Sequence, residues 1–63
     1  MSFNKKFIDE KLIKQCLEQG LDFSKLFKGD VLIFLDDTSS KVYYWFVEGL
    51  TNEEIKLKLY KNG

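Results

Sequence analysis

Apolar residues fall in four segments of the chain, and the spacing within each segment predicts an element of secondary structure. The first segment repeats at the spacing of one helical face, at Ile8, Leu12, Ile13, Cys16 and Leu17. Asp9 is placed to cap this helix, because Ile8 and Ile13 would flank it as a hydrophobic staple. Gly20 can end the helix, since glycine takes positive φ at little cost. We expect a helix over Asp9–Gln19.

The second segment, Leu21–Lys28, predicts a short helix that leads into a sheet. Its bulky apolar residues lie at i, i+3 and i+4 and would bury on one side: Phe23, Leu26 and Phe27. Asp22 or Ser24 is placed to cap one or two helical turns. Gly29 then breaks the chain before the next apolar run.

The third segment contains two apolar runs, Val31–Leu35 and Val42–Val47, on either side of a polar break at Asp36–Lys41. The first run is largely aliphatic and the second contains four aromatic residues, a composition typical of paired strands. A four-residue loop at 37–40 would set Leu35 opposite Val42. We therefore expect an antiparallel β-hairpin.

Neither face of this expected hairpin is polar, whereas a solvated antiparallel pair alternates apolar and polar residues. A chain of 63 residues has few elements with which to cover both faces. The second face should therefore meet the C-terminal segment, a second copy of the chain or a protein partner. Tyr43 and Trp45 are candidate contact residues, because residues with apolar rings and polar tips are enriched at interface hot spots.

The last segment favours a helix over Asn52–Lys61, since Thr51 and Glu54 have the T-x-x-E spacing of a capping box. Against this, residues 55–61 alternate apolar and polar, which would give a third strand instead. The expected fold is α+β, with an N-terminal helix, a short second helix, an antiparallel β-hairpin and a C-terminal helix in one domain of residues 1–63. No internal repeat is evident.

Composition narrows the classes of function. One cysteine and no histidine exclude an internal disulfide and argue against a structural zinc site. The sequence has no histidine that could act as the base for a carboxylate or hydroxyl nucleophile. The glycines are isolated from one another, so they do not form a phosphate-binding loop. We therefore expect no enzyme, no cofactor and no metal. No apolar run is long enough to cross a membrane and the N-terminus lacks the apolar core of a signal peptide, so the expected compartment is the cytoplasm.

The formal net charge is zero, but the charges are segregated along the chain. Residues 30–54 carry six acids against the single Lys41. Either this block reflects the local preference of turns and helix starts for acids, or it forms a negative recognition surface. In the second case the candidate contacts for a protein partner are Asp36, Asp37, Glu48, Glu53 and Glu54. Direct contact with nucleic acid is not expected, since carboxylates repel phosphate.

The same part of the chain carries a family-like pattern at Asp30-Val31, Leu35, Asp37, Lys41, Tyr43-Tyr44 and Gly49-Leu50. This pattern resembles the small uracil-DNA glycosylase inhibitors encoded by some phages, and the tail EEIKLKLYK is similar to the end of that family. The resemblance implies a hairpin framework, a dimer and carboxylates that mimic DNA charge in the enzyme's DNA-binding cleft. The family's enzyme-contacting helix has no counterpart here, so its contact residues are not placed.

We therefore expect a small non-catalytic binding protein, a phage-type inhibitor of a nucleic-acid enzyme that acts through protein contact. The alternative is a structural or adaptor module that forms a homodimer and has no inhibitory role. Both hypotheses predict that reversing the charges of Asp36 and Asp37 leaves folding intact.

Overall fold

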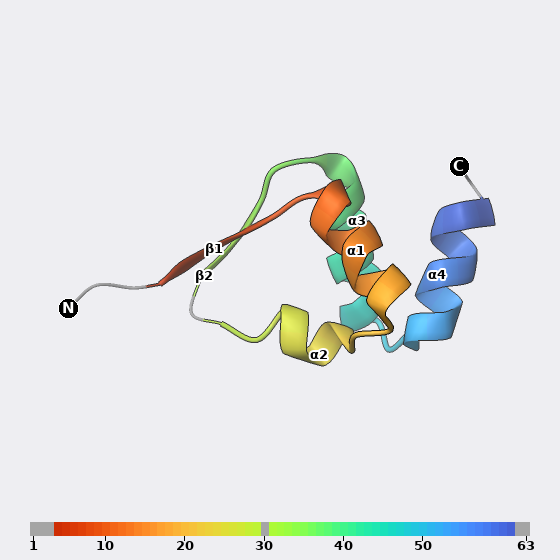
Figure 1. Ribbon diagram of the computed structural model, residues 1–63. Helices are drawn as coiled ribbons and strands as arrows, with labels where there is room; N and C mark the ends of the chain where they lie inside the picture. Colours follow the sequence, from red (N-terminus) through yellow and green to blue (C-terminus); the bar gives the residue numbers. More distant parts are fainter. Residues whose placement is uncertain (1–3, 30, 62–63) are drawn as a thin grey trace.

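The computed structural model describes residues 4–29 and 31–61, and Figure 1 shows how their elements are arranged. Their order along the chain is β1 (Lys5–Ile8), α1 (Glu10–Gln19), α2 (Phe23–Leu26), β2 (Val31–Phe34), α3 (Asp37–Val47) and α4 (Asn52–Lys61). The two strands lie side by side at one end of an elongated molecule of 42 × 22 × 19 Å, and α4 lies at the other end. Asp30, one acid of the predicted block, falls outside the described residues.

The expected antiparallel hairpin is wrong. β2 contains most of the first apolar run, but it pairs in parallel with β1, in a register that sets Ile8 beside Phe34. The N–H of Leu35 extends this pairing by donating to the carbonyl of Ile8 over 2.9 Å. The sequence pattern does not predict β1, because the strand has only four residues and begins with two lysines. The second apolar run belongs to α3.

The second run is helical because its inward-facing residues have helical spacing, at Ser39, Val42, Tyr43 and Phe46. Ser39 and Val42 are fully buried, and the two aromatic rings pack against the core. Asp36 caps the helix through its side chain, which accepts a hydrogen bond from the N–H of Ser39. The polar break is therefore a helix start rather than a turn. An Asp followed by small polar residues is favoured in both, so the sequence alone does not distinguish them.

The other three helices confirm the predicted caps. The Asp9 side chain accepts the N–H of Leu12 over 2.8 Å at the start of α1. Asp22 accepts the N–H of Ser24 over 3.0 Å at the start of α2. The capping box before α4 forms in both directions: Thr51 N–H donates to Glu54 over 2.9 Å, and Glu54 N–H donates to the Thr51 hydroxyl over 3.2 Å. The alternative of a third strand is wrong.

The elements form two successive β–α–α units, β1–α1–α2 and β2–α3–α4. In both units an Asp follows the strand and caps the next helix, and a Gly-Leu pair ends that helix. Gly20 and Gly49 have φ values of 70° and 103°, which would strain any residue with a side chain. The N–H groups of each Gly-Leu pair donate back to carbonyls of the last helical turn, as in a Schellman motif. The sequence alone did not reveal this repeat, because only the capping Asp and the Gly-Leu pair recur in the two units. The residues between them are not similar.

The core lies where the four helices meet the inner side of the sheet. Its buried apolar residues are Ile8, Ile13, Cys16, Leu17, Phe23, Phe27, Val42 and Ile55. The ring of Phe27 lies at the centre of the aromatic part, 5.6 Å from the ring of Phe23 and 5.0 Å from that of Tyr43, between centroids. The rings of Phe34 and Phe46 also contact it. Phe27 therefore joins the end of α2 to both β2 and α3.

Replacing Phe27 by alanine should cost about 3–5 kcal/mol, because a buried ring is lost and a cavity remains. A domain of this length has a total stability of roughly 3–9 kcal/mol, so the variant should be close to unfolding in water. Phe7→Ala is the matched control, since its ring is 56% exposed and its loss should cost less than about 1 kcal/mol. Urea unfolding at a dilution that keeps the chain monomeric measures both variants. Equal losses at the two positions would contradict the described core.

Candidate functional site

The sheet is covered by helices on one face only. Ile8, Leu32 and Phe34 point inward, and all three belong to the core or pack against it. The intervening positions form the opposite face, which we call the outer sheet face: Lys5, Phe7, Val31, Ile33 and Leu35. Directly paired residues of a parallel sheet share a face, so the register sets Phe7 beside Ile33. Phe7 and Leu35 are 56% and 59% exposed.

An uncovered apolar face is unusual for parallel strands. Parallel sheets occur almost always with both faces covered, and an isolated pair of strands is marginally stable in water. Here the outer sheet face is apolar except for Lys5 at the start of β1, and β2 is apolar at each of its positions. Among the described residues, none of the apolar side chains of that face belongs to the core or packs against it. Figure 1 shows the two strands extending away from the helices. The arrangement therefore presents an apolar surface that fits a protein contact.

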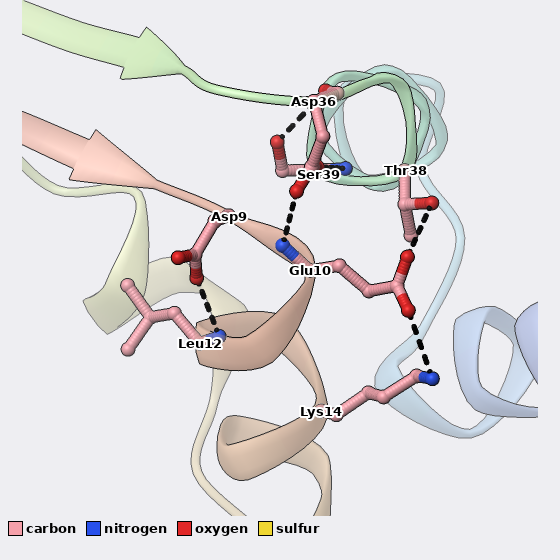
Figure 2. A network of polar contacts seen from close by, with 7 residues as sticks. All are labelled: Asp9, Glu10, Leu12, Lys14, Asp36, Thr38 and Ser39. Carbon is pink, nitrogen blue, oxygen red and sulfur yellow. Dashed lines mark hydrogen bonds and ion pairs between the residues drawn. The ribbon is translucent and has the colours of Figure 1, made fainter.

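Asp36, predicted as a partner contact, joins two helices of its own chain (Figure 2). Its Oδ1 accepts the N–H of Ser39 over 2.9 Å, and its Oδ2 accepts the N–H of Glu10 over 2.8 Å. The first bond caps α3, and the second satisfies a free N–H at the start of α1. The backbone N–H of Ser39, followed by that of Glu10, lowers the pKa of the Asp36 carboxyl. Both oxygens of Asp36 therefore serve the fold.

The other predicted carboxylates do not form one surface with Asp36. Glu54 belongs to the capping box, where the N–H of Thr51 lowers its pKa. Asp37 and Glu53 are exposed in the first turns of α3 and α4 and have no hydrogen bond or ion pair among the described residues. Glu48 lies at the far end of α3, and its carboxylate raises the pKa of Tyr44. The eleven residues of α3, about 16 Å of helix, separate the two ends of the predicted acidic surface.

The two predicted aromatic contacts lie in different surroundings. The ring of Tyr43 meets that of Phe27 edge to face at 5.0 Å between centroids, which makes it part of the core packing. The half-buried ring of Trp45 instead lies under the ammonium of Lys58, 5.2 Å from the ring centroid. Both side chains are half-buried and pack against the core, and only the ring of Trp45 also has a lysine over one of its faces among the described residues.

Sequence reasoning missed Phe7, although a signal was present. Phe7 and Ile8 directly precede the cap of α1, as Phe34 and Leu35 directly precede the cap of α3. Two apolar residues before a capping Asp mark the end of a strand in both units. Comparing the two segments would have indicated a second strand before α1, though not its pairing.

The described residues contain no set of three potential metal ligands. The single thiol, Cys16, is buried and donates to the carbonyl of Leu21 over 3.3 Å. Burial raises the pKa of this thiol, which opposes the thiolate form that a nucleophile needs. None of the helices in the described part of the chain has both the length and the apolar character to span a bilayer.

Comparisons with known protein families, with curated proteins and with solved structures find no match to this chain. The resemblance to the glycosylase inhibitors therefore stays a prediction. The stretch that carries it folds as β2 and α3, so the hairpin framework that it implied is absent from the described residues.

Replacing Asp36 by alanine should lower stability by about 1–2 kcal/mol, because the cap of α3 and the bond to α1 are both lost. Asp36→Asn should lower stability by less than Asp36→Ala does. The single amide oxygen of asparagine can keep the cap of α3, but the second oxygen, which accepts the N–H of Glu10, is gone. Asp37→Ala is the matched control and should cost about 0.5 kcal/mol, the effect of one charge on the helix dipole. Thermal and urea unfolding measure the series. This result would replace the earlier expectation that both acids can be reversed without effect on folding.

Stability should also fall in acid. Backbone N–H groups lower the pKa values of Asp22, Asp36 and Glu54 in the folded chain. A carboxyl with a lower pKa when folded stabilises the fold above its unfolded pKa, about 4, and loses this effect as pH falls through the folded pKa. Urea unfolding between neutral pH and pH of about 2 should show the loss, with a shallower slope in a double variant, Asp36→Asn with Glu54→Gln. An unchanged slope would contradict these assignments.

Proposed function

We propose that this protein is a small non-catalytic binding domain that associates with a second copy of itself through the outer sheet face. The uncovered apolar face of a parallel sheet carries this proposal. Two copies packed face to face would give each sheet the second cover that parallel strands require. The contact would bury Phe7 and Leu35, which are otherwise large apolar side chains in water.

The charges near the sheet favour a second copy as the occupant. Lys5 and Lys6 lie where the strands begin, whereas Asp36 and Asp37 follow the strand end. In a two-fold dimer with the strands of the two copies running in opposite directions, the basic end of each sheet lies against the acidic end of the other. The apolar residues between these ends need no charged complement. The outer sheet face of one copy is therefore complementary to that of a second copy, with apolar residues in the middle and opposite charges at the two ends.

A double variant, Phe7→Ser with Leu35→Ser, should weaken self-association at least about thirtyfold, because two apolar anchors are lost from the centre of the contact. The matched control replaces Tyr44 and Val47 on α3 by serine, since these side chains are similarly exposed, at 61% and 62%. Sedimentation velocity over a range of protein concentrations measures the association. Far-UV circular dichroism checks that both variants keep their helices. A wild-type chain that stays monomeric, or equal weakening in the two variants, would contradict the proposal.

Inhibition of a uracil-DNA glycosylase is a narrower form of the same binding role and rests on the resemblance alone. Asp37, Glu48 and Glu53 are the predicted carboxylates that make no cap, so they are the ones to test. If the chain inhibits uracil release from a labelled duplex, lysine at these three positions should abolish inhibition without unfolding. A control variant with lysine at Asp9, Glu10 and Glu18 would be unsuitable. Asp9 and Glu10 make hydrogen bonds at the start of α1, so their replacement would also change stability. Wild-type activity of the glycosylase at a molar excess of this protein would exclude the inhibitor role.

A further inference from the structure

A cleft of about 280 Å³ lies between the three helices α1, α3 and α4. The α1 side contributes Glu10 and Lys14, one helical turn apart. The side chains from α3 are Thr38, Lys41 and Trp45, which share one face of that helix, and those from α4 are Lys58, Leu59 and Tyr60. The lining therefore combines three lysines and two aromatic rings with a single acid.

The single acid is already occupied (Figure 2). The carboxylate of Glu10 accepts a hydrogen bond from the Thr38 hydroxyl over 3.1 Å and pairs with the Lys14 ammonium at 2.9 Å. These two contacts hold Glu10 and Lys14 against the wall, with their charges balanced. They leave the two other lysines of the lining without an acid inside the cleft.

Lys41 and Lys58 give the cleft its charge. Asp37 lies one turn before Lys41, and Glu54 lies one turn before Lys58, but neither forms an ion pair with its lysine within the described residues. Glu54 is held by the capping box instead. A chain with no net charge thus places two uncompensated ammonium groups around one cleft. Such a cleft attracts anions.

The aromatic ring of Trp45 adds a second requirement. Lys58 sits over one face of this ring, 5.2 Å from its centroid, in a cation–π contact that an entering ring can replace by stacking. Displaced from that position, the flexible lysine keeps its ammonium within reach of an anion at the ring's edge. Tyr60, which is 45% exposed, forms a further wall.

We infer that this cleft binds a small planar aromatic molecule that carries one anionic group, with the ring on Trp45 and the anion between Lys41 and Lys58. The volume suits a ligand with one ring system, since it lies just below the range of drug-sized sites, about 300–1,000 Å³. Phosphate and carboxylate both fit the charge, because each accepts hydrogen bonds from ammonium groups. The lining of the cleft includes no residue of the outer sheet face, so the site is separate from the proposed self-association.

Fluorescence of Trp45, the only tryptophan in the chain, tests the inference. Adenosine 5′-monophosphate and benzoate represent the two possible anions, and adenosine and inorganic phosphate each lack one half of the required chemistry. At least one of the two aromatic anions should change the emission saturably, and adenosine and phosphate should bind about tenfold more weakly or worse. Added salt should weaken the binding, since the lysines lie in an open cleft.

The matched variants separate a site from general attraction to lysine. Lys41→Gln with Lys58→Gln should raise the dissociation constant of the aromatic anion by about tenfold or more. Lys25→Gln with Lys28→Gln makes the same charge change outside the cleft and should leave the constant unchanged. Three results would overturn the inference: no saturable change with either aromatic anion, equal binding of adenosine, or equal weakening in the two double variants.

Discussion

The carboxylate of Asp36 holds together the part of the molecule from which all other elements extend. Parallel strands bring the starts of the two following helices to the same edge of a sheet, where free N–H groups of both helices face each other. Asp36 accepts one N–H from each helix. Without such a group, the start of α1 and the start of α3 would present like partial charges to one another. The geometry of β1 and β2 therefore requires an acid at this position.

This requirement gives one acid of residues 30–54 a structural explanation in place of a role in recognition. A carboxylate that caps a helix and one that faces a partner look alike in a sequence, because both occur at exposed positions near breaks. The structure separates them by bonds: Asp36 and Glu54 accept backbone N–H groups, whereas Asp37 and Glu53 accept none within residues 4–29 and 31–61. The positive cleft between the helices shows the converse, since its lysines come from three different elements and lie far apart in the sequence.

Local signals predicted α1, α2 and α4 well, but they did not predict α3 or the pairing of the sheet. Asp9, Gly20 and the Thr51–Glu54 box act within a few residues, so their spacing alone fixes where α1 and α4 begin or end. The partner of β2 lies 26 residues away, and nothing near Val31 indicates whether it pairs with β1 or with the run that follows. The aromatic run misled because strand composition and helical spacing coincide in it, and the choice depends on packing against Phe27. The cleft could not be predicted from the sequence either, because its lining comes from three separate helices of the chain.

The bond between Asp36 and Glu10 has a consequence for how the chain folds. It joins residues 26 positions apart, so it can form only after α1, α2 and the turn into β2 have closed a loop. The helices with local caps can form transiently before that, but the strands cannot pair and α3 cannot dock until the loop closes. We therefore expect formation of the parallel pair to be the slow step, which would complete β1, α1 and α3 together. A chain of this kind folds in a single cooperative transition rather than one unit after the other.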